Sequence, residues 1–156
     1  MEKITSFTID HIKLQPGLYV SRKDKVGAET VTTFDLRLTN PNEEPVMNTA
    51  EIHTMEHLGA TYLRNEPQWK DKVLYFGPMG CRTGFYLIKW EEDSPEVVAE
   101  ALEKTLQRIL DTEEVPAVSQ VSCGNYKDHS LFSAKEYAKD VLEKGLSRDP
   151  FERTFA

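Results

Sequence analysis

The sequence predicts an α+β fold, in which an antiparallel β-sheet packs with α-helices as a two-layer sandwich. Segments rich in β-branched and aromatic residues occupy much of 1–39 and recur within 72–90, with helical patterns between and after them. Their order lacks the regular strand–helix–strand alternation that is typical of a parallel sheet. No repeat or linker-like composition interrupts residues 1–156, so we expect a single domain.

The amino-terminal part is expected to contribute strands. Residues 4–9, 17–21 and 30–39 alternate polar and apolar side chains, as strands with one buried face do. The next stretch, NPNEEPVMN, is rich in proline and asparagine and is predicted to be a loop.

A helix is predicted between Asn48 and Pro67. Asn48 is placed as its N-cap, and Glu51 completes a capping box. Pro67 limits the far end, because proline cannot continue a helix.

Two further strands and two further helices follow. Residues 72–77 and 84–90 are predicted strands, joined by the turn PMGCRT, which contains Cys81. Ser94 and Pro95 mark the start of a helix whose role is to cover the sheet. Its apolar stripe comprises Val97, Val98, Ala101, Leu102, Leu106, Ile109 and Leu110. A last helix is expected from Ser133, with Glu136 as its capping partner. The loop VSCGNYKDHS before it contains Cys123.

Composition and charge exclude several classes of protein. The net charge of −7, the pI near 5.1 and the lack of basic runs argue against a nucleic-acid-binding surface. The first twenty residues do not resemble a signal peptide, and no apolar run reaches the length of a membrane span. We therefore expect a soluble, cytoplasmic protein whose two cysteines stay reduced.

The stretch HTMEHL places two histidines on one helix face. His53 and His57 are four residues apart, so their rings can converge on one point, and Glu56 lies beside them. His-x-x-Glu-His is the inverted form of the zincin motif, in which histidines hold a metal and glutamate acts as base. The alternative is a polar surface helix with two solvated histidines.

Two protein ligands hold a metal weakly, so a third is expected elsewhere in the chain. Candidates are Cys123, His129, Cys81 and His11. Cys123 is favoured, because two histidines and one thiolate leave a coordination position open for water or substrate. The alternative for Cys123 is a small buried apolar residue.

Cys81 has a different setting. It lies between Gly80 and Arg82 in a turn, where exposure and a nearby guanidinium could lower its pKa. Such a thiol suits a nucleophile or base, and the alternative is a packed cysteine.

Taken together, five separated blocks make the chain closely resemble the LuxS family of S-ribosylhomocysteine lyases. They are SFTIDH (6–11), FDLR (34–37), HTMEHL (53–58), PMGCRTGFYL (78–87) and CGNYKDH (123–129). They run through nearly the whole chain in the family's order, and none carries a substitution that suggests a dead enzyme. Residues 64–75 carry no family motif.

The resemblance implies an α+β homodimer with two active sites at the subunit interface. It implies one Fe²⁺ per subunit, replaceable by Zn²⁺ or Co²⁺, on the residues matching His53, His57 and Cys123. The implied reaction converts S-ribosylhomocysteine to homocysteine and 4,5-dihydroxy-2,3-pentanedione, the precursor of autoinducer-2. This reaction serves the activated methyl cycle and quorum sensing.

The resemblance also implies roles for the remaining motif residues. The sugar carbonyl must migrate through enediolates until β-elimination of the thioether is possible, which requires proton shuttles, and we assign these to Glu56 and Cys81. Ser6, His11 and Arg37 are expected at the substrate site, and Arg37 is also expected to help keep Cys81 ionised. His11 could instead be a surface histidine.

Three points remain open at this stage. His129 matches a family histidine to which we assign no role. One competing function is a metallopeptidase that uses the inverted motif, although that class usually takes its third ligand from a carboxylate. The other is a closed, structural metal site with four protein ligands and no catalysis.

Overall fold

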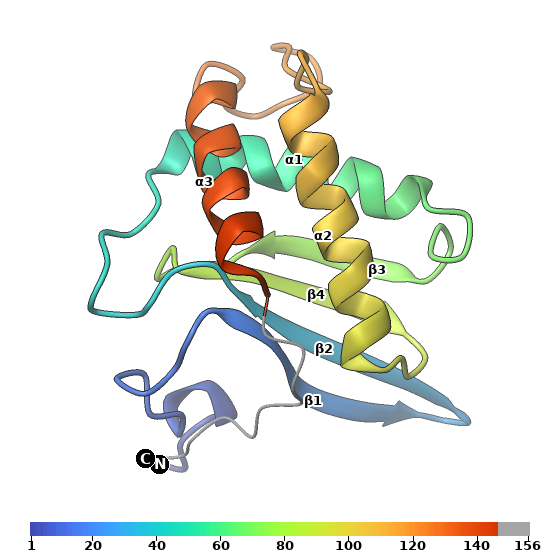
Figure 1. Cartoon of the computed structure of the whole chain (residues 1–156). Coiled ribbons are helices and arrows are strands. Elements are labelled where there is room, and N and C mark those ends of the chain that lie inside the picture. Colours follow the sequence, from blue (N-terminus) through green and yellow to red (C-terminus); the bar gives the residue numbers. More distant parts are fainter. Residues whose placement is uncertain (147–156) are drawn as a thin grey trace.

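A four-stranded antiparallel sheet with three helices on one side forms the molecule (Figure 1). The computed structural model describes residues 1–146. The sheet has the order β1-β2-β4-β3, and the α+β prediction is confirmed. The strands are β1 (Gly17–Val26), β2 (Glu29–Arg37), β3 (Val73–Pro78) and β4 (Gly84–Trp90). The helices are α1 (Thr49–Asn65), α2 (Pro95–Asp111) and α3 (Leu131–Lys144).

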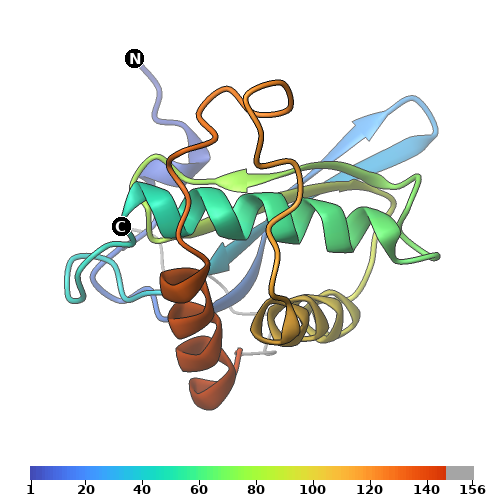
Figure 2. The same cartoon turned by 90° about the horizontal axis from the view of Figure 1, so that it is seen from above.

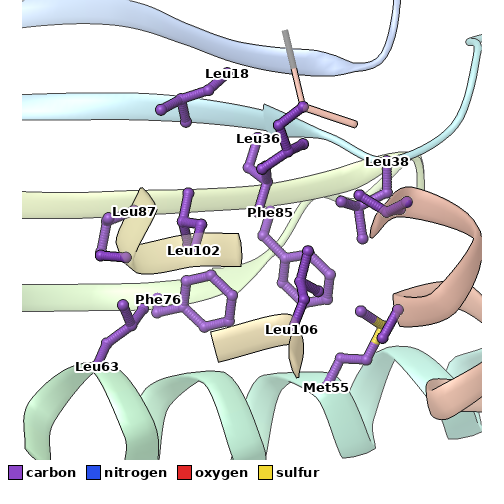
Figure 3. Close-up of a cluster of buried hydrophobic side chains, with 14 of the residues drawn as sticks. Leu18, Leu36, Leu38, Met55, Leu63, Phe76, Phe85, Leu87, Leu102 and Leu106 are labelled. Carbon is purple, nitrogen blue, oxygen red and sulfur yellow. The ribbon is translucent and has the colours of Figure 1, made fainter. Parts of the chain in front are cut away.

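The hydrophobic core lies between the sheet and the helices. Leucines, phenylalanines and Met55 from all four strands and from α1 and α2 meet in this layer (Figure 3). Gly59 permits the close approach of α1 to β3, because a Cβ at this position would lie 2.3 Å from Cε1 of Phe76.

The register of β2 decides which side chains leave the core. Phe34 and Leu36 belong to the core cluster, so the alternation of the strand turns Asp35 and Arg37 to the opposite face. Arg37 pairs with Gly84 across the ladder, at the start of β4. The turn that carries Cys81 is therefore placed beside the end of β2.

The prediction of a strand at 4–9 is wrong. Residues Thr5–Phe7 form a short 3-10 helix, η1, and Ile9 makes only an isolated bridge. The hydroxyl of Thr8 donates to the carbonyl of Thr5 at 2.7 Å, and this local bond closes the turn. An alternating pattern without a neighbouring strand does not form a ladder.

Two details of the helices also differ from expectation. The cap of α3 is Ser130 and not Ser133, because the Ser130 hydroxyl accepts a hydrogen bond from the backbone N–H of Ser133 at 3.2 Å. Glu136 therefore is not the capping partner. In α2 the stripe lies at the core as predicted except for Val97, which is 43% exposed, and Leu110, which is partly buried.

None of the three helices covers the second face of the sheet (Figure 1). Half-exposed side chains of β2 and β4, among them Val31, Thr33, Tyr86 and Ile88, lie on this face. Within residues 1–146, no helix combines the length and the apolar character that crossing a bilayer requires.

Candidate metal centre

Helix α1 presents His53 and His57 on one side, as the spacing predicts. Its start is fixed by the predicted capping box, in which the backbone N–H of Asn48 donates to Glu51 at 2.6 Å. The two imidazole rings lie 4.7 Å apart between centroids and are nearly perpendicular, at 87°. Both rings are half-buried, so they point away from the hydrophobic core.

The connection between α2 and α3 brings Cys123 to this helix. Residues 112–130 leave the end of α2, cross over α1 and return to α3 (Figure 2). The Sγ atom of Cys123 lies 3.4 Å from Nε2 of His53 and 3.8 Å from Nε2 of His57. The expected approach of this loop to the helix is therefore found.

Backbone carbonyls of the same loop orient both histidines. Nδ1 of His53 lies 2.9 Å from the carbonyl oxygen of Asp128, and Nδ1 of His57 lies 2.9 Å from that of Pro116. A carbonyl can only accept, so each Nδ1 carries the proton and each Nε2 keeps its lone pair. This tautomer is the one that can ligate a metal through Nε2.

His129, which was a candidate ligand on sequence grounds but had no role assigned from the family resemblance, joins the cluster. Its Nε2 lies 3.9 Å from Sγ of Cys123, and one possible ligand atom from each of the four residues lies within 4.8 Å of the others. Nδ1 of His129 contacts the hydroxyl of the buried Thr54 at 3.0 Å, and that hydroxyl also accepts from the backbone N–H of Ser130. A hydroxyl can donate or accept, so the tautomer of His129 is not fixed as those of His53 and His57 are.

The ring planes limit which histidines can share one ion. A metal lies close to the plane of the imidazole that binds it, and His53 and His129 are stacked at 3.9 Å with only 24° between their planes. Planes so nearly parallel do not meet close to the two rings, so these two cannot both ligate the same ion in this arrangement. His53 is closer to the sulfur and has the fixed tautomer.

The donor set fits a divalent metal. Tetrahedral coordination at the usual bond lengths separates a nitrogen and a sulfur ligand by roughly 3.5 Å, close to the two separations observed. The cluster within residues 1–146 contains no carboxylate, unlike the sites that metallopeptidases of the inverted motif use. Two imidazoles and one thiolate do not choose among iron, cobalt and zinc.

Glu56 lies on α1 directly before His57. Its side chain is half-buried and makes no hydrogen bond or ion pair with residues 1–146. Residues 1–146 therefore leave this carboxylate without a hydrogen-bonding partner.

Cys81 occupies a separate turn between β3 and β4. The turn is closed by the backbone N–H of Arg82, which donates to Met79 at 2.9 Å, and Cys81 is exposed there. Partial desolvation of the sulfur raises its pKa, but hydrogen bonds from Thr83 and the charge of Arg37 outweigh this effect. The pKa of Cys81 consequently lies below its ordinary value, the direction that the sequence suggested, but Thr83 and Arg37 cause the shift and the adjacent Arg82 does not.

The three residues predicted for substrate binding lie outside the metal cluster. Ser6 lines a surface hollow of about 440 Å³ on the open face of the sheet, with Tyr86 and Ile88. Nδ1 of His11 contacts the carbonyl of Ile9 at 2.9 Å. Arg37 is 2% exposed and contacts Asp35, Thr83 and Cys81. No lining residue of the hollow belongs to the cluster.

The chain is similar to one family of known proteins over most of its length. The family model described as S-Ribosylhomocysteinase (LuxS) matches residues 4–152. The S-ribosylhomocysteine lyase of Clostridium acetobutylicum is 55% identical over 152 residues, which cover 96% of each chain. Those of Finegoldia magna and Phocaeicola vulgatus are 54% and 51% identical, over 91% and 92% of this chain and 90% and 92% of theirs. The chain belongs to the S-ribosylhomocysteinase (LuxS) family.

Proposed function

We propose that this chain cleaves the thioether of S-ribosylhomocysteine and releases homocysteine and 4,5-dihydroxy-2,3-pentanedione. The observation that carries the proposal is the meeting of His53, His57 and Cys123 in a chain of the LuxS family. The carbon that bears the sulfur has no acidic neighbour until the sugar carbonyl migrates along the chain. Each migration is a proton transfer through an enediolate, and β-elimination follows.

The proposed ligands of one divalent ion per subunit are His53, His57 and Cys123, with Fe²⁺ as the ion and Zn²⁺ or Co²⁺ as replacements. When bound, such an ion supplies Lewis-acid stabilisation of the negative charge on the enediolate oxygens. The chain contributes two imidazoles whose Nε2 lone pairs are free because backbone carbonyls hold their Nδ1 protons.

Glu56 and Cys81 are the proposed proton shuttles. The carboxylate of Glu56 is free of partners among residues 1–146 and projects from the helix that carries the histidines, so it can take and return a proton beside the cluster. Cys81, with its lowered pKa, can act first as thiolate base and then as thiol acid.

Substrate binding is assigned to Ser6, His11 and Arg37, and the working enzyme is proposed to be a homodimer with its active sites at the interface. The half-exposed face of the sheet supports this assembly, because none of the helices within residues 1–146 covers it and Ser6 lines its hollow. Analytical ultracentrifugation checks it: a particle of twice 17.9 kDa is expected, and a monomer at assay concentration would contradict the dimer.

A closed structural metal site is the second candidate, and the position of His129 favours it. Four protein ligands would leave no room for substrate. The stacked ring planes of His53 and His129 argue against four simultaneous ligands. Catalysis and a closed site predict different outcomes in the assay below.

The decisive assay measures free thiol released from S-ribosylhomocysteine under anaerobic conditions. Iron-loaded protein should release one thiol per substrate consumed, metal-stripped protein should be inactive, and added Fe²⁺ should restore activity. Equal activity in loaded and stripped protein would remove the metal from the mechanism, and no thiol release from loaded protein would leave only the structural site.

A further inference from the structure

Four side chains form a continuous series of hydrogen bonds that ends on the sulfur of Cys81. The carboxylate of Asp35 accepts from Nε and Nη2 of Arg37 at 2.8 and 3.0 Å. Nη1 of Arg37 donates to the hydroxyl oxygen of Thr83 at 2.8 Å. That oxygen lies 3.2 Å from Sγ of Cys81, closer than Nη1 of Arg37, which is 3.7 Å away.

The series is shielded from solvent up to its last member. Asp35, Arg37 and Thr83 are 0%, 2% and 4% exposed, whereas Cys81 is exposed. The pairing of β2 with β4 sets the spacing, and the carbonyl of Thr83 accepts from the backbone N–H of Leu38 at 2.9 Å. Gly84 is needed beside it, because a Cβ there would lie 2.0 Å from the carbonyl oxygen of Leu36.

The chemistry of these groups fixes the direction of each bond. A guanidinium only donates, so the Thr83 oxygen must accept from Arg37. Its own hydrogen then remains for the nearest further acceptor, which is the Cys81 sulfur. We propose that Thr83 is a positioning residue that donates its hydroxyl hydrogen to the Cys81 thiolate, with Asp35 and Arg37 holding the donor in place.

This arrangement suits a sulfur that gains and loses a proton, and in that respect the inference rests on the proposed function. When the thiolate takes a proton from a substrate carbon, the carbon–hydrogen electron pair stays on the substrate and an S–H bond forms. Thr83 keeps its own proton throughout and can rotate to accept from the S–H. Donation from Arg37 polarises the hydroxyl and favours the thiolate form.

The groups around the series do not compete for this role near neutral pH. Desolvation and the charge of Asp35 raise the pKa of Tyr19 on β1, so its phenol stays neutral. Asp35 also outweighs the desolvation of Arg37 and raises its pKa. Besides these, Tyr86 on β4 interacts with the charge of Arg37, and Arg82 adjoins Cys81 in the turn.

The test is the pH dependence of iodoacetamide alkylation at Cys81 in the metal-loaded protein, followed on the Cys81 peptide by mass spectrometry. The chain has only one other cysteine, Cys123, which is read on its own peptide. In Thr83→Ala the midpoint should rise by about one pH unit, so that alkylation below the midpoint slows about tenfold. Thr83→Ser keeps the hydroxyl and loses the same methyl group, so it should alkylate as the parent does.

Two results would overturn the inference: a midpoint in Thr83→Ala equal to that of the parent, or equal shifts in Thr83→Ser and Thr83→Ala, which would show a packing role. Thr83→Val keeps the branched shape and replaces Thr83→Ala if the latter does not fold. Alkylation does not require turnover, so it tests Thr83 separately from the proposed function. If the parent protein is alkylated at Cys81 as expected but releases no thiol from S-ribosylhomocysteine, the proposed function fails and the inference about Thr83 does not. In active protein, the acidic limb of kcat should move with the alkylation midpoint.

Discussion

The metal cluster and the Cys81 turn are held in different ways. Around His53 and His57 the fixed partners are carbonyl oxygens of a crossing loop. Around Cys81 the partners are chiefly the side chains of Thr83 and Arg37. A carbonyl can only accept, so it fixes one imidazole tautomer, whereas side-chain donors can adjust to a thiol that, under the proposed function, changes its protonation state. The difference matches a site that holds a metal and a site that moves protons.

Replacing each cysteine by alanine in a separate variant gives the largest contrast. Cys123→Ala should lower metal affinity by at least about 100-fold and abolish turnover, because one of three ligands is lost. Cys81→Ala is its matched control and should stay fully loaded with metal. Metal analysis after anaerobic dialysis decides between them, and near-stoichiometric metal in Cys123→Ala would mean that another residue is the third ligand.

Proton transfer should be separable from metal binding. Glu56→Gln and Cys81→Ala should each keep the metal and lose about 10²- to 10⁴-fold in kcat, the usual contribution of general acid–base groups. The thiol-release assay measures this loss. Glu113→Gln, which removes an exposed carboxylate from the crossing loop, serves as control. Full activity of either principal variant would exclude that residue from the mechanism.

Asp35 and Arg37, which hold Thr83 beside Cys81, should also stabilise the fold. Asp35→Asn removes the negative charge that pairs with the buried guanidinium of Arg37. Removing one partner of a buried ion pair typically lowers the free energy of unfolding by about 3–5 kcal/mol. Urea denaturation measures the change.

Helix α3 offers an exposed control. Lys144 and Asp140 form an ion pair at 2.8 Å, four residues apart, and both side chains are about half exposed. Asp140→Asn should lower the free energy of unfolding by no more than about 0.5 kcal/mol. Equal losses in both variants would show that burial does not distinguish the two pairs.

The smallest effect is expected at His129. His129→Asn should retain one metal per chain and lose about tenfold in affinity, the low end of the roughly 10- to 100-fold that changes around a ligand set usually cost. Competition with a chromophoric chelator gives the affinity. A loss as large as that in Cys123→Ala would instead make His129 a ligand and favour the closed site.

Helix α1 shows how far the sequence alone could predict the site. The capping box and the four-residue spacing of His53 and His57 are local properties, and both were read correctly. That Cys123 reaches them depends on a loop crossing between helices, which spacing cannot show, although the donor set and the family resemblance both favoured this residue. His129 carried one signal, its place six residues after Cys123, but its approach depends on Thr54.

The resemblance implied that Arg37 lies near Cys81, but the contacts of Asp35 and Thr83 could not be predicted from the sequence, for a related reason. Arg37 and Thr83 are far apart in the chain, and they meet only because β2 pairs with β4 in one register. Local patterns misled at two places: the alternation of 4–9 was read as a strand, and Ser133 was taken for a cap that Ser130 provides. In both cases a hydrogen bond over three residues decided the structure.

X-ray absorption spectroscopy of the iron-loaded protein, with and without substrate analogue, tests the central claim most directly. Our account predicts one sulfur at about 2.3 Å, two imidazole nitrogens near 2.1 Å, and a light-atom position that changes when the analogue binds. A spectrum without sulfur, or one with three imidazoles that the analogue leaves unchanged, would contradict it.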